Sequence, residues 1–146
     1  MTHELKTGGD RGYLRIATEE AFATQEQMDA ILSLVSQGRA DKGTVSLWGF
    51  YGNSPSERTT FIRERLLDLG PLRIQAMDDA GIDKAVLALT SPGVQTLFDV
   101  ADAKRIARNS NDQLKAACER YPDRFYGMIA SNCSWVAKAS SVAMRK

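Results

Sequence analysis

The sequence is poor in the residue types that most often bind metals or form disulfides. Its 146 residues include two cysteines, Cys118 and Cys133, and one histidine, His3. The cysteines form no CxxC pair, and Cys118 falls on the apolar face of a predicted helix, so buried free thiols are favoured over a disulfide. The histidine lies in an N-terminal stretch that has no periodic apolar pattern.

Long apolar runs and an excess of one charge are absent as well. No run approaches the roughly 18 residues of a membrane span, and residues 1–11 are too polar for a secretory signal. The 19 basic and 18 acidic residues give a formal net charge of +1, with no block of like charge that would favour nucleic acid or a membrane surface. These features predict a cytoplasmic protein whose partner is a small soluble ligand.

Strand-like and helix-like segments alternate along the chain, as is typical of α/β proteins. Strands are predicted at residues 13–18, 84–90 and 124–130, and the second is an almost uninterrupted apolar run typical of a parallel strand buried on both faces. Apolar residues at helical spacing predict helices between Thr24 and Gly38, over 69–80, and from Val100 to near Tyr121.

Residues 38–60 have the composition of a loop, with several glycines and a proline. Three aromatic residues, Trp48, Phe50 and Tyr51, interrupt this composition. Aromatic side chains in a long loop either cover a ligand or pack the loop against its own scaffold, and the packing role is favoured here.

The chain is predicted to divide into a flexible leader (1–12), an α/β domain (13–130) and an atypical tail (131–146). The tail has four serines, three alanines and three basic residues but no acidic residue. It fits a disordered or loosely docked segment, a terminal helix with a weak apolar face, or the product of a shifted reading frame.

Several motifs in the α/β domain carry a family resemblance. They are Ile16-Ala17-Thr18-Glu19-Glu20-Ala21-Phe22-Ala23 and the segments 65–68, 74–83, 87–95, 107–112 and 121–125. In this order they resemble the N-terminal portion of the amidohydrolase-related decarboxylases, and most closely the gamma-resorcylate and 2,3-dihydroxybenzoate decarboxylases. The resemblance implies a metal-dependent (β/α)₈ barrel. Such a barrel takes about 250 residues, so the chain is expected to form a partial TIM barrel: three strands with an inserted helix and loop.

The resemblance also implies a metal ligand. Glu19 occupies the glutamate position of the family's Glu-x-His pattern, whereas Ala21 stands where many members have histidine and where the dihydroxybenzoate group has alanine. Glu19 is therefore expected to bind zinc or manganese. Taken without the family, Glu19 and Glu20 are better explained as an exposed carboxylate pair at a strand end, or as an N-cap of the next helix, than as metal ligands. In the family the other ligands come from later strands, so no catalytic residue is assigned within this chain.

The turn after the second predicted strand is a candidate substrate site. Ser91 and Gln95 follow this strand and would lie on the same rim of the sheet as Glu19. A simple turn would explain Pro92 and Gly93 by itself, and this alternative is slightly favoured over binding. Asn109 and Asn111 are poor helix formers within a predicted helix, which indicates structural hydrogen bonding.

The resemblance implies a non-oxidative carboxy-lyase of hydroxybenzoate-type aromatic acids, truncated in this chain, with a small aromatic carboxylic acid as its partner. One alternative is a non-catalytic remnant that binds a small molecule or a protein. Another is an amidohydrolase-type hydrolase, which is less favoured because the His-x-His pair of such enzymes is absent. Three parallel strands would leave open sheet edges, and these predict a homo-oligomer or self-association.

Overall fold

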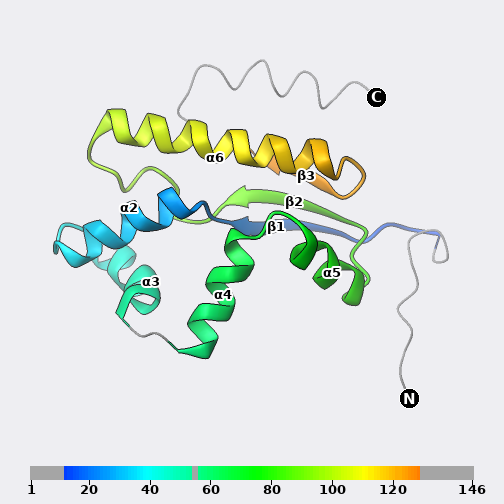
Figure 1. Ribbon diagram of the computed structural model, residues 1–146, viewed down its shortest axis with the longest axis horizontal. Helices are drawn as coiled ribbons and strands as arrows, with labels where there is room; N and C mark the ends of the chain where they lie inside the picture. Colours follow the sequence, from blue (N-terminus) through cyan, green and yellow to red (C-terminus); the bar gives the residue numbers. More distant parts are fainter. Residues whose placement is uncertain (1–11, 54–55, 129–146) are drawn as a thin grey trace.

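A computed structural model of the chain describes residues 12–53 and 56–128 as three strands and five helices (Figure 1). In chain order these are β1 (Ile16–Phe22), α2 (Gln25–Ser36), α3 (Lys42–Asn53), α4 (Glu57–Leu67), α5 (Pro71–Asp79), β2 (Lys84–Leu89), α6 (Val100–Arg120) and β3 (Phe125–Met128). The predictions for the leader, the tail, His3 and Cys133 lie outside the described residues. No helix within the described ranges has the length and apolar character needed to cross a membrane.

The three strands form a parallel sheet, as the sequence predicted, and lie in the order β1-β2-β3. We call its two sides the helix face and the open face. The helix face carries Phe22, Ala85, Leu87 and Phe125, which form one buried core with Met77 of α5 and with Leu114 and Ala117 of α6. In Figure 1, α6 lies in front of β3 and covers part of this face.

The open face carries the alternate side chains of the same strands: Ile16, Ala21, Val86, Ala88, Tyr126 and Met128. These side chains are half-buried or exposed, and none belongs to a core cluster of the described residues. The expectation that the second strand is buried on both faces is therefore wrong, because helices of the described part cover one side only. In a complete (β/α)₈ barrel, the corresponding side is filled by side chains of the other strands.

Helix α2 forms where the sequence predicted a helix. The Thr24 hydroxyl accepts a hydrogen bond from the backbone of Gln27 at 3.2 Å and caps the first turn. Met28 and Ile31 on its inner side are fully buried. Gly38 ends the helix with a φ of +66°, a left-handed conformation that glycine adopts at little cost.

The predicted loop at residues 38–60 is largely helical, and this prediction is wrong. Helix α3 fills most of the segment despite its glycines, and α4 begins at Glu57 behind a capping box made by Ser56 and Thr59. Burial outweighs the low helix propensity of glycine here, because Trp48 is 1% exposed and packs against α2. The packing role favoured for Trp48 is thus confirmed.

The first turn of α3 depends on a carboxylate outside the helix. One oxygen of Asp41 accepts hydrogen bonds from the backbone of Gly43 at 2.8 Å and of Thr44 at 3.0 Å. Its other oxygen accepts one from the Thr44 hydroxyl at 2.6 Å. The hydroxyl and then the backbone of Thr44 are the main causes that lower the pKa of Asp41.

We therefore expect a pH-dependent effect of Asp41→Asn. A pKa below the unfolded value means that the charged carboxylate stabilises the fold above that value, and that this contribution is lost as the pH falls through the folded-state pKa. The variant should melt at a lower temperature than the wild type near neutral pH, and the difference should shrink in acid. Thermal unfolding across a pH series measures this, and a difference that stays constant would contradict it.

Candidate functional site

Glu19 lies within β1 rather than at its end. The strand was predicted to stop at residue 18, but it continues to Phe22. The pairing with β2 shifts between Ala17, opposite Ala85, and Glu20, opposite Leu87. One extra residue therefore stands in β1 at this point, a β-bulge that holds Thr18 and Glu19 opposite Val86. Glu19 is exposed. Successive side chains of a strand point to opposite faces, and Glu20, opposite Leu87, belongs to the helix face, so the Glu19 side chain belongs to the open face.

The neighbouring carboxylate has a different environment. Glu20 shares its register with Leu87 and so belongs to the helix face, where a carboxylate oxygen lies 3.9 Å from the Arg73 guanidinium. Neither glutamate caps the following helix, because Thr24 does. The N-cap alternative is therefore wrong, and the exposed-carboxylate alternative still applies to Glu19.

Arg73 on α5 fixes the end of β1 from the helix face. Its guanidinium donates hydrogen bonds to the carbonyl oxygens of Ala21 at 2.8 Å, Arg65 at 3.0 Å and Asp68 at 2.9 Å. Burial lowers the pKa of Arg73, against the opposite influence of Glu20 and Asp68. This one side chain thus connects β1, the end of α4 and α5. Sequence patterns gave no signal for it, because its partners are backbone carbonyls.

Ser91 and Gln95 lie in the turn that follows β2, and both side chains are exposed. The turn begins beside the end of β1, since the Thr90 backbone N–H donates to the Phe22 carbonyl at 2.8 Å. Gly93 has a φ of +67°, and a Cβ added to it would lie 2.6 Å from the side-chain oxygen of Gln95. The position of this turn on the rim is as expected, and so is its need for glycine. Binding of a substrate by Ser91 and Gln95 stays a prediction.

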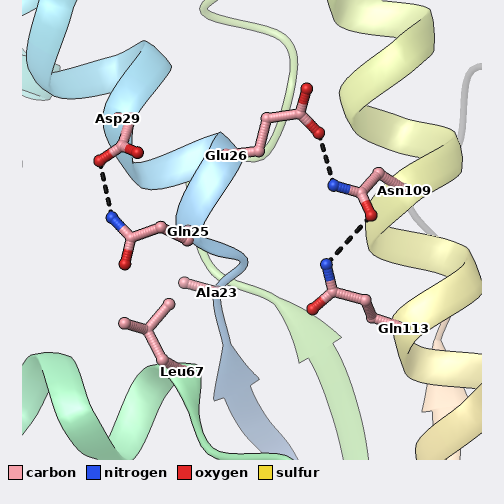
Figure 2. Close-up of a pocket in the computed structure, with 7 residues that line it drawn as sticks. All are labelled: Ala23, Gln25, Glu26, Asp29, Leu67, Asn109 and Gln113. Atoms are coloured by element: carbon pink, nitrogen blue, oxygen red, sulfur yellow. Dashed lines mark hydrogen bonds between the residues drawn. The ribbon is translucent and has the colours of Figure 1, made fainter.

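A cavity of about 680 Å³ lies elsewhere, between α2 and α6 (Figure 2). The polar side chains around it bind one another: Gln25 donates to Asp29 at 2.7 Å, and Asn109 donates to Glu26 and accepts from Gln113 at 3.0 Å. This confirms a structural hydrogen bond for Asn109. None of Glu19, Ser91 and Gln95 lines this cavity, so it does not coincide with the predicted site.

The described residues do not fit a metal centre by themselves. Across residues 12–53 and 56–128, no three histidine, cysteine, aspartate or glutamate side chains come together. A catalytic zinc ion usually takes three protein ligands and keeps a further position open for water or substrate. Among the described residues only Glu19 was predicted as a ligand of the metal, and this role stays a prediction.

The chain resembles known decarboxylases in sequence and in structure, although no family model matches it. A solved 5-carboxyvanillate decarboxylase from Novosphingobium aromaticivorans, with manganese and 4-hydroxy-3-methoxy-5-nitrobenzoic acid, is 58% identical with a TM-score of 0.88 over 100% of this chain. A gamma-resorcylate decarboxylase from a Polaromonas species is 33% identical over 116 residues, or 80% of this chain. A solved dihydroxybenzoic acid decarboxylase from Polaromonas, with manganese and 2-nitroresorcinol, is 32% identical with a TM-score of 0.61 over 80% of this chain.

These relatives are much longer than the chain. It spans 42% of the Novosphingobium enzyme and 30% of each Polaromonas protein. The predicted fold, a partial barrel of about three strands, is confirmed by this partial coverage and by the parallel sheet. The chain is thus a homologue of part of the gamma-resorcylate and 5-carboxyvanillate decarboxylases.

Proposed function

We propose that the chain forms part of a metal-dependent, non-oxidative decarboxylase of hydroxybenzoate-type aromatic acids, in which Glu19 is one ligand of manganese or zinc. The position of Glu19 carries this proposal: it is an exposed carboxylate on the open face, the side of the sheet that faces the interior of a complete barrel. The manganese bound in the Novosphingobium and Polaromonas structures supports a divalent ion.

The proposal extends to further parts of the site. A carboxylate oxygen suits both zinc and manganese, but the remaining ligands would have to come from outside the described residues. Ser91 and Gln95 would contact a small aromatic carboxylic acid from the rim. A cytoplasmic location and self-association through the β1 and β3 edges, both expected from the sequence, belong to the same proposal.

One observation favours a second candidate function. The described residues bring together no set of three metal ligands. A non-catalytic remnant that binds a small molecule or a partner requires no such set. The two functions differ in what they predict when the rest of a barrel is supplied. The proposed enzyme regains activity, whereas the remnant does not.

Fragment complementation tests the proposal. The chain is co-expressed with the remaining part of the Novosphingobium decarboxylase, and a complex that co-elutes in gel filtration is assayed for manganese content and for carbon dioxide release from 5-carboxyvanillate. We expect manganese-dependent activity in the complex. Glu19→Gln should reduce manganese affinity at least about 100-fold, since the loss of groups that merely orient a ligand already costs about 10–100-fold.

Glu20→Gln is the matched control, because Glu20 is the adjacent carboxylate but belongs to the helix face. It should leave manganese affinity within a few-fold of the wild type. A co-eluting complex that takes up no metal and releases no carbon dioxide would support the remnant instead. Equal manganese affinity in the Glu19→Gln complex would exclude Glu19 as a ligand.

A further inference from the structure

We infer that Gln27 and Trp48 are positioning residues that hold the turn at residues 90–93, and with it Ser91 and Gln95, in place at the rim of the sheet. The inference rests on the proposed function, because it concerns how the proposed substrate-binding side chains are held. It assigns a role to two helices, α2 and α3, that lie between β1 and β2 in the chain.

The turn is held through its backbone. The Gln27 side-chain amide donates to the carbonyl of Thr90 at 3.2 Å and lies 3.5 Å from that of Gly93. The indole N–H of Trp48 donates to the carbonyl of Ser91 at 3.0 Å. Three carbonyl groups of one short turn therefore accept hydrogen bonds from two side chains, which come from different helices.

Both donors are rigidly placed. Gln27 is 0% exposed and Trp48 is 1% exposed, and Trp48 packs in the same buried cluster as Met28 and Ile31. On the other side of the turn, Val94 is buried against α6. The backbone is thus fixed from within the protein at both ends of the turn, while the side chains of Ser91 and Gln95 remain exposed. Such an arrangement presents polar groups on a rigid support, which binding sites require.

Gln27 has a further property that packing alone does not explain. Its side-chain oxygen is buried and has no hydrogen-bond partner among the described residues. A buried polar atom without a partner is unfavourable, and a methionine of similar size would fill the space without one. What glutamine supplies and methionine lacks is the N–H donor that contacts the carbonyls of the turn.

Hydrogen exchange on the full chain tests this inference. Gln27→Met and Trp48→Phe each remove the donor and preserve most of the side-chain volume, whereas Met28→Leu is the matched control in the same buried cluster. We expect amide exchange in residues 91–97 to become about tenfold faster in the first two variants and to stay unchanged in the control. The melting temperature should change little in Gln27→Met, whereas it should fall in Trp48→Phe, because the smaller ring leaves part of the buried site empty. Unchanged exchange in both variants would overturn the inference.

Binding of a probe separates this inference from the proposed function. In the complemented complex, affinity for 4-hydroxy-3-methoxy-5-nitrobenzoic acid should fall in Gln27→Met while the manganese content stays constant. Faster exchange with unchanged affinity would overturn the role in substrate positioning. If the wild-type complex binds no probe, the proposed function fails, and the exchange rates still decide whether the two residues hold the turn.

Discussion

Replacing Arg73 with alanine is expected to lower the free energy of unfolding by about 3–5 kcal/mol. The change removes a donor that three carbonyl groups share and leaves them unpaired where water has little access, since the Arg73 side chain is 12% exposed. Chemical denaturation of the purified chain, followed by circular dichroism, measures the difference. A loss of this size is a large share of the roughly 5–15 kcal/mol that stabilises a typical domain.

Two further variants define the cause of this loss. Arg73→Lys keeps the positive charge but lacks the planar fork of donors, so most of the destabilisation should remain. Arg65→Ala removes an exposed contact with the Leu72 carbonyl and should cost about 1 kcal/mol or less. Full stability of Arg73→Lys would mean that charge, through Glu20 and Asp68, matters more than the geometry of the hydrogen bonds.

The second large effect is expected from Leu87→Ala, which should destabilise the chain by about 2–5 kcal/mol. Leu87 is 0% exposed at the centre of the helix face, where the strands meet α5 and α6. Removing its side chain leaves a cavity that the surrounding core fills only in part. Denaturant unfolding with an unchanged m-value would identify a loss of packing rather than a change in compactness.

The preceding residue provides the matched control. Val86 belongs to the open face of the same strand, so Val86→Ala should cost about 1 kcal/mol or less in the isolated chain. The comparison tests the assignment of the two faces directly. Equal losses for the two variants would show that the open face is covered in solution, by another copy of the chain or by residues outside those described.

The elements that the sequence predicted well are those whose signals are local. The apolar run at residues 84–90 became β2, and the periodic segment from Val100 became α6, which ends at Arg120 just before Tyr121. Thr24 caps α2 as expected. In each case the residues that decide the structure lie within the element or directly beside it.

The errors arose where distant contacts outweigh local composition. The glycines near Trp48 predicted a loop, but burial of the indole against α2 supports a helix. Glu19 and Glu20 looked like the end of a strand, yet β1 continues because it is an edge strand of the described sheet and Glu20 has Arg73 beside it. Such partners, tens of residues away, leave no pattern in the local sequence.

The candidate site was accessible from the sequence only in part. The family motif pointed to Glu19, and the position after a strand pointed to Ser91 and Gln95. The supporting contacts of Gln27 and Trp48 were not predicted, because they join residues 63 and 43 positions apart in the chain. A pattern search finds the side chains that face a ligand more readily than the buried donors behind them.

The bulge in β1 also bears on how relatives are to be compared. Ile16 and Ala21 are five residues apart, but their partners Lys84 and Ala88 are four apart. The one extra residue of β1 therefore lies at Thr18 or Glu19. A homologue could lose one residue here and keep every other strand pairing intact. Sequence alignments through this segment should therefore admit a single gap, and the acidic position matched to Glu19 should be chosen by strand register rather than by counting from Phe22.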